Sequence, residues 1–157
     1  MNTKEYISKA AVGFNGGDFY ETVYNSEQYI VQFQKGKIIL FSQERISEKT
    51  SPYYDMFVTE LSIDEVTDLL RSKLQAVYKG NEYNVGMVAA HGSKLEIIGE
   101  YENRDRDEAL GITYNHEEGL RSKFIDFTEI DELKIKRESI YERVKATKPE
   151  KEQGLKV

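Results

Sequence analysis

The chain of 157 residues contains no cysteine and no tryptophan, and it has only two prolines and two histidines. Without cysteine there can be no disulfide, no thiolate nucleophile and no metal site built on sulfur. Two histidines also leave few imidazoles to act as a general base. These absences exclude enzymes that use a cysteine nucleophile and proteins whose zinc or iron–sulfur site has cysteine ligands.

Long apolar runs are missing as well. A helix that crosses a membrane needs about 20 consecutive apolar residues, and no run in this chain exceeds a few. Residues 1–17 mix charged side chains with isolated apolar ones and lack the pattern of a signal peptide. We therefore expect a cytoplasmic protein that does not contact a membrane.

A basic excess is also absent, because 22 lysines and arginines face 28 aspartates and glutamates and give a formal net charge of −6. Proteins that bind nucleic acid by counterion release need a basic face. The charge therefore argues against a nucleic-acid partner. It suits a protein partner with a basic surface.

The residues that are present suffice for one folded domain. Tyrosine and phenylalanine bring the aromatic content to 11%, and a chain of this length can bury most of its apolar side chains without a disulfide or a metal. We expect a single domain over residues 1–147 and a flexible tail over 148–157. We find no internal repeat and no linker that would divide the chain.

Segments rich in β-branched and aromatic residues predict strands at 19–24, 29–33, 38–41 and 53–60. The turn at Lys35-Gly36 has two possible registers. A two-residue loop would give Lys35 a positive φ, which a long side chain disfavours. We therefore predict a type I turn with Gly36 in a bulge, which places Val31 opposite Ile39.

The stretch 61–80, LSIDEVTDLLRSKLQAVYKG, has the clearest helical pattern of the chain. Ser62 and Glu65 have the spacing of a capping box, and Gly80 is placed to end the helix. Apolar residues recur on one side at helical spacing, namely Ile63, Val66, Leu69, Leu70, Leu74 and Val77. We predict one long amphipathic helix over residues 63–79.

The segments on either side of this stretch predict shorter elements. A short helix capped by Thr3 is expected over 3–12. Strands are expected at 84–90 and 94–101, with a hairpin turn at His91-Gly92. Gly86 lies inside the first of these strands and predicts a bulge or a close backbone approach.

The last third of the chain is expected to contain a long loop over 102–119, a strand over 120–127 and a helix over 129–146. A single turn of helix is possible in the loop at 107–110. Thr128 and Asp131 have capping-box spacing, and Pro149 ends the helical pattern.

Together these elements predict an α+β fold. A mainly antiparallel sheet of about five to six strands would pack against the central helix and the C-terminal helix, in the order α-βββ(β)-α-ββ(β)-α. This order of elements resembles that of acidic secretion chaperones and of several small toxin-immunity proteins. The resemblance rests on the order alone.

Few residues have the spacing that chemistry requires. His91 is expected in a tight turn, where its role is to tolerate the backbone conformation. His116, with Glu117, Glu118 and either Asp105 or Asp107, could bind a divalent ion, but the spacing matches no EF-hand. A solvated acidic loop is the favoured interpretation, and we expect no catalytic residue, metal or cofactor.

Recognition is the function that these residues favour. Tyrosine and arginine are common at the energetic centres of interfaces, and both occur in the acidic loop. The predicted partner-binding residues are Tyr101, Arg104, Asp105, Arg106, Asp107, Glu108, Glu117 and Glu118. The alternative is that neighbouring arginines and aspartates pair with one another at the surface.

We therefore predict a non-enzymatic acidic protein that binds and masks a partner protein with a basic surface, such as an immunity protein, an antitoxin or a phage-encoded inhibitor. One alternative is a protein that binds a nucleotide-like small molecule through Gly13–Asp18 and the guanidinium groups of Arg104, Arg106 and Arg121. Another is a homodimer that acts like a secretion chaperone.

Overall fold

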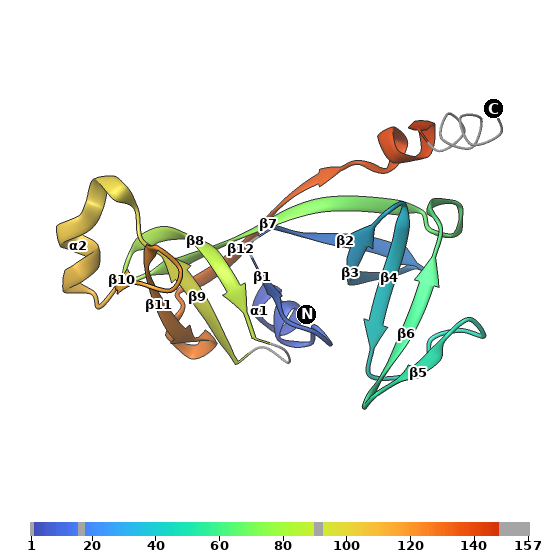
Figure 1. Cartoon of the computed structure of the whole chain (residues 1–157), viewed down its shortest axis with the longest axis horizontal. Helices are drawn as coiled ribbons and strands as arrows, with labels where there is room; N and C mark the ends of the chain where they lie inside the picture. Colours follow the sequence, from blue (N-terminus) through green and yellow to red (C-terminus); the bar gives the residue numbers. More distant parts are fainter. Residues whose placement is uncertain (1, 16–17, 90–92, 148–157) are drawn as a thin grey trace. The chain divides into compact units, whose positions relative to one another are not determined.

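A computed structural model of the chain describes residues 2–15, 18–89 and 93–147. Its contacts group into two compact units, which are described separately (Figure 1). Unit 1 contains Met1–Asp18 and Lys73–Lys136, and unit 2 contains Phe19–Ser72 and Arg137–Val157. The chain passes between the units inside three strands, β2 (Asp18–Tyr24), β7 (Asp68–Tyr78) and β12 (Glu132–Ser139).

Unit 2 begins with an antiparallel meander whose first three strands confirm the sequence prediction. They are β2 (Asp18–Tyr24), β3 (Glu27–Gln34) and β4 (Lys37–Ser42). The predicted fourth strand is two strands, β5 (Ser51–Tyr53) and β6 (Met56–Leu61), joined by a turn in which Tyr54 has a φ of 54°. The sheet order in this unit is β2-β3-β4-β6-β5.

The β3–β4 turn differs from the prediction. Gln34 pairs with Lys37, and Val31 lies opposite Leu40, not Ile39. The loop therefore has two residues, Lys35 and Gly36, with φ values of 51° and 77°. Such a turn matches the twist of its flanking strands, and this match outweighs the cost of a left-handed lysine.

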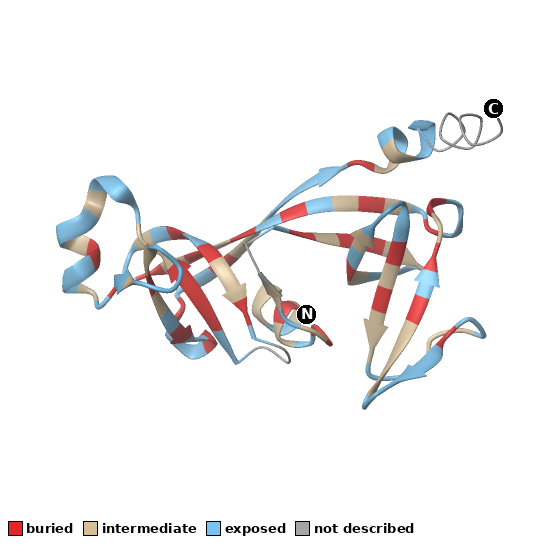
Figure 2. Cartoon of the chain, in the orientation of Figure 1, coloured by how far each residue is buried: buried red, intermediate tan, exposed pale blue. Residues whose placement is uncertain are grey.

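The long central helix is absent, and this part of the prediction was wrong. Ser62 and Glu65 do form a capping interaction, since the Ser62 amide donates to Glu65 Oε1 at 3.1 Å. The box opens only a single 3-10 turn, η1 (Ile63–Glu65), and is followed by the strand β7 (Asp68–Tyr78). From Ser72 to Tyr78 every second residue of β7 is buried, which is the period of a strand (Figure 2).

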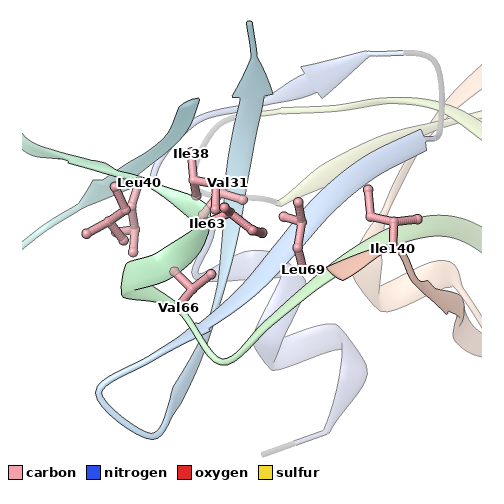
Figure 3. Packing of buried hydrophobic residues seen from close by; sticks show 8 residues of the cluster. Val31, Ile38, Leu40, Ile63, Val66, Leu69 and Ile140 are labelled. Atoms are coloured by element: carbon pink, nitrogen blue, oxygen red, sulfur yellow. The ribbon is translucent and has the colours of Figure 1, made fainter. Parts of the chain in front are cut away.

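The core of unit 2 lies between these strands and the chain after β12. It is formed by Val31, Ile38, Leu40, Leu61, Ile63, Val66, Leu69 and Ile140 (Figure 3). Leu69 and Ile140 are also joined through their backbones, because the Ile140 amide donates to the Leu69 carbonyl at 2.8 Å. Several residues assigned to a helical stripe thus pack in the core from a strand and a 3-10 turn.

Unit 1 is also built on antiparallel strands. After α1 (Thr3–Ser8) and β1 (Phe14–Asn15), its strands include β8 (Asn81–Val88), β9 (Lys94–Ile98), β10 (Thr113–Asn115) and β11 (Leu120–Asp126), in the sheet order β10-β11-β9-β8-β7. The bulge predicted at Gly86 is confirmed, because the β8–β9 register shifts between Val85 and Met87. The predicted turn at His91-Gly92 lies outside the described residues.

The segment between β9 and β10 contains more helix than the predicted loop. It forms η2 (Tyr101–Asn103) and α2 (Arg104–Ala109), which begins three residues before the expected turn. The N-terminal helix is shorter than predicted, and its cap is Asn2, whose side chain accepts from the Glu5 amide at 2.9 Å.

The predicted C-terminal helix over 129–146 is also wrong. The first part of this segment forms η3 (Phe127–Glu129) and the strand β12 (Glu132–Ser139). After β12, residues 141–147 are helical. The capping box lies at Asp126 and Glu129, where the Asp126 amide donates to Glu129 Oε2 at 3.1 Å. It does not lie at Thr128 and Asp131.

Arg137, which lies in the segment predicted as the C-terminal helix, binds a buried carboxylate of unit 2. Glu21 is fully buried, and its Oε1 accepts from Arg137 Nε at 3.0 Å. Gln28 Nε2 donates to Glu21 Oε2 at 2.6 Å, and Ser72 Oγ donates to Oε1. The charge of Glu21 is thus compensated inside the unit.

The two units share a local structural motif that the sequence analysis missed. In each, a capping box opens a 3-10 turn that leads into a strand, β7 in one case and β12 in the other. The amide of the second residue after each turn donates to the carbonyl of the penultimate residue of a strand. Thr67 donates to Val23 of β2 at 3.1 Å, and Asp131 donates to Val77 of β7 at 2.8 Å. The expectation of no internal repeat therefore needs correction at this local level.

The fold is mainly antiparallel β, and the predicted α+β class with two long helices is wrong. The single domain over 1–147 stays a prediction, and the predicted tail over 148–157 lies outside the described residues. Within the described chain, every helix is too short and too polar to cross a membrane.

Candidate functional site

A pocket of about 370 Å³ opens on unit 1, over strands β7, β8, β9 and β11 and the turn after β10. Its lining consists of Asp18, Lys73, Asn84, Val85, Gly86, Met87, Glu96, Ile98, Glu118 and Leu120. Three of these are acidic and one is basic, while Met87, Ile98 and Leu120 supply half-buried apolar surface. The pocket thus combines carboxylates with an apolar wall.

Glu96 is the unusual residue of this pocket. It lies inside β9, opposite Met87 of β8 and Phe124 of β11, and it is only 2% exposed. Its Oε2 atom is buried and accepts no hydrogen bond from a donor group of the described chain. An unpartnered buried carboxylate oxygen is costly, which marks Glu96 as a position with a role beyond packing.

The bulge at Gly86 provides the space for this carboxylate. A Cβ atom at Gly86 would lie 2.5 Å from Glu96 Oε1 and 2.7 Å from Ile98 Cδ1. Both distances are shorter than real contacts of a Cβ, so a side chain at this position would displace the carboxylate. The glycine therefore leaves room for the Glu96 carboxylate and for the end of the Ile98 side chain where the strand is irregular.

Glu118 approaches Glu96 from the turn between β10 and β11. The turn is closed by the Gly119 amide, which donates to the Asn115 carbonyl at 2.8 Å, and Asn115 Nδ2 donates to Glu118 Oε1 at 2.9 Å. Burial of Glu96, followed by its hydrogen bond with Glu118, raises the pKa of Glu96 to about 7. Ser122 acts in the opposite direction by donating to the ionised form.

Two neighbouring carboxyl groups can share one proton, or they can share a cation that takes its place. The only basic side chain among the lining residues that the structure describes is Lys73, which is exposed. It forms no salt bridge to Glu96 or Glu118 within 4.0 Å in the described chain. The pair therefore has no internal cation at close range.

The predicted site residue Asp107 lies elsewhere in unit 1 and is fully buried. Its carboxylate accepts from the Tyr83 hydroxyl and from the Glu100 amide, each at 2.9 Å. Burial and this hydrogen bond raise the pKa of Tyr83 to about 12. Asp107 fastens α2 to the sheet and offers no surface to a partner.

The predicted arginines are held by nearby acidic side chains. Arg106 Nη2 lies 3.1 Å from Asp107 Oδ1, and Arg121 Nη1 lies 3.6 Å from Asp107 Oδ2. Arg104 Nε forms an exposed ion pair with Glu108 Oε1 at 3.0 Å. The pairing expected as the alternative interpretation thus occurs, and these groups are not arranged to converge on a phosphate.

The other predicted residues remain at the surface. Tyr101 is 96% exposed, and Asp105 and Glu117 are exposed. His116 and Tyr114 make an edge-to-face contact with 4.8 Å between their ring centroids. In residues 2–15, 18–89 and 93–147, no group of three histidine, aspartate or glutamate side chains is placed to hold a metal ion.

The sequence analysis identified Glu118 and Gly86 but missed Glu96. The available signal was a carboxylate inside an apolar strand, LEII, next to the strand in which Gly86 predicted a bulge. The two observations belong together only when β8 and β9 are paired in register. The carboxylate pair is therefore a product of sheet pairing and is not visible as a motif.

Comparisons with other proteins add no assignment to this geometry. The chain matches no protein-family model, no curated protein and no solved structure.

Proposed function

We propose that this chain is a non-enzymatic protein that binds and masks a partner protein with a basic surface, in the cytoplasm, as an immunity protein, an antitoxin or a phage-encoded inhibitor would. The observation that carries the proposal is the carboxylate pair of Glu96 and Glu118. The buried Oε2 of Glu96 receives no hydrogen bond from a donor group of the described chain, and Glu96 and Glu118 both line a pocket. A cationic group from outside would satisfy this oxygen.

Other exposed side chains of unit 1 have the same sign of charge as the pair. Asp105, Glu117 and Glu118 are exposed, and none of them forms a salt bridge in the part of the chain that the structure describes. Their charges add to the formal net charge of −6. Charges of one sign that are not compensated internally steer an oppositely charged partner and favour its docking.

The test is partner capture by the purified chain, followed by identification of the captured protein by mass spectrometry and measurement of its affinity with the purified partner. Neutralisation of four exposed carboxylates, Asp105→Asn, Glu108→Gln, Glu117→Gln and Glu118→Gln, should weaken binding. The affinity should also fall as the salt concentration rises, because exposed charges are screened.

A matched control changes the net charge equally but in unit 2, at exposed carboxylates: Glu44→Gln, Glu48→Gln, Asp55→Asn and Glu142→Gln. This control should bind the partner nearly as tightly as the unaltered chain. If both variants lose affinity equally, general charge and not this surface explains capture. If neither does, or if salt has no effect, the proposal is wrong.

A further inference from the structure

The pocket on unit 1 has features that specify the group it can accept. Its apolar wall, formed by Met87, Ile98 and Leu120, stands beside the two carboxyl groups. A bare metal ion would make no use of that wall. An aliphatic stem that ends in a positive charge would use both parts, because such side chains pack their methylene groups on apolar surface and keep the charge at a polar group.

We propose that this pocket receives a single lysine or arginine side chain of the partner, with its stem against Met87, Ile98 and Leu120 and its charged head between Glu96 and Glu118. The inference rests on the proposed function and names the group recognised. The head would donate to Glu96 Oε2, which receives no hydrogen bond from a donor group of the described chain, and would replace the proton that Glu96 and Glu118 can share. A charge-assisted hydrogen bond of this kind is stronger than a neutral one.

The geometry favours an organic cation over the alternatives. The pocket volume, about 370 Å³, is in the range of sites for small molecules and exceeds what an ion needs. An anion would face Asp18, Glu96 and Glu118 together. Lys73 is the single basic residue in the described lining, and it would oppose the incoming cation from the rim.

Binding should exchange a proton for the cation. Burial and Glu118 favour the protonated form of Glu96 near neutral pH, and a cation between the two carboxyl groups favours the ionised form of both. The other charged groups in the described lining of the pocket are Glu118, Asp18 and Lys73. Lysine binding should therefore strengthen as the pH rises from about 5.5 to about 8.

The experiment uses three acetylated and amidated pentapeptides, in which a central lysine, arginine or norleucine is flanked by glycines. Norleucine has the stem of lysine without its charge. Binding to the full chain is followed by the amide resonances of Gly86, Glu96 and Glu118 in NMR titrations at matched ionic strength. The lysine or arginine peptide should shift these resonances in a saturable way, and the norleucine peptide should not.

Variants assign the effect to the carboxylates. Glu96→Gln and Glu118→Gln should each lower the affinity about tenfold, because one charge-assisted contact is lost. Lys73→Met should raise it by about threefold, because a like charge is removed. Glu102→Gln changes an exposed carboxylate on η2 and should leave the affinity unchanged.

The outcomes separate this inference from the proposed function. Equal binding of the norleucine peptide, or unchanged affinity in Glu96→Gln together with no pH dependence in the unaltered chain, would overturn it. Displacement of the lysine peptide by low calcium or magnesium concentrations would instead identify a metal site and also overturn it. A partner that binds Glu96→Gln normally contradicts the pocket alone, whereas peptide binding without any basic partner contradicts the proposed function alone.

Discussion

Replacement of Asp107 by asparagine should reveal how firmly α2 is fastened to unit 1. The Asp107 carboxylate accepts hydrogen bonds from Tyr83, Glu100 and Arg106 while it is fully buried. Asparagine keeps one acceptor oxygen and presents an amide group to the remaining donors. The Arg106 side chain is 35% exposed, so its ion pair is screened and contributes little.

The magnitude follows from the buried hydrogen bond donated by Tyr83 and the part-buried one donated by the Glu100 amide. A hydrogen bond to a charged group contributes about 1.5–3 kcal/mol, and an unsatisfied buried donor costs about 1–3 kcal/mol. One lost bond and one donor without an acceptor give a destabilisation of roughly 3–5 kcal/mol. For a chain of this length that corresponds to a fall in Tm of roughly 6–20 °C.

Urea unfolding followed by circular dichroism measures this difference, and Asp105→Asn is the matched control. Asp105 lies two residues away on the same helix and is exposed, so its replacement should change the free energy of unfolding by about 0.5 kcal/mol or less. If the two variants differ by less than about 1 kcal/mol, Asp107 is not a buried acceptor, and the described packing of α2 is incorrect.

Three further predictions concern other features. The pKa of Glu96 is raised in the folded chain to about 7 from 4.5, so the folded state binds more protons than the unfolded state between these pH values. The free energy of unfolding should therefore fall as the pH rises through this range, by up to about 3 kcal/mol, and thermal melts at several pH values should show no such dependence in Glu96→Gln. Lys35 and Lys79 occupy left-handed turn positions, which asparagine adopts more readily than lysine, so Lys35→Asn and Lys79→Asn should each stabilise the chain by about 0.5–1 kcal/mol. Their effects in urea unfolding should add, and a loss of stability would contradict the assigned turn type. A double-mutant cycle with Glu21→Gln and Arg137→Met should give a coupling energy above about 0.5 kcal/mol, and additivity would show that the ion pair is not formed.

The positions of most strands in the first half of the chain could be predicted from the sequence, because their residues are β-branched or aromatic and clear turn residues separate them. Residues 63–79 could not. Leucine, lysine, arginine, glutamine and alanine are good helix formers, and the Ser62–Glu65 box looked like the start of a helix. The segment is nevertheless a strand because β2, β8 and β12 supply its hydrogen-bond partners, and such tertiary pairing overrides a local preference.

The same reason explains what was missed in the candidate site. Asp107 and Glu118 lie in one acidic stretch and looked alike in sequence, yet Asp107 is the buried residue of α2 and Glu118 lines the pocket. Glu96 became visible as a candidate only through the pairing of β9 with β8 and β11. Burial and strand register, which depend on the whole fold, distinguish these carboxylates.

The discontinuous composition of both units limits how the protein can be shortened. A fragment of residues 19–72 would omit Ile140, which belongs to the core of unit 2, and a fragment beginning at Lys73 would omit the N-terminal helix of unit 1. No single cut of the polypeptide yields either half intact. Deletion mapping of an interaction would therefore lose binding for reasons unrelated to contact, and point substitutions are the appropriate tool.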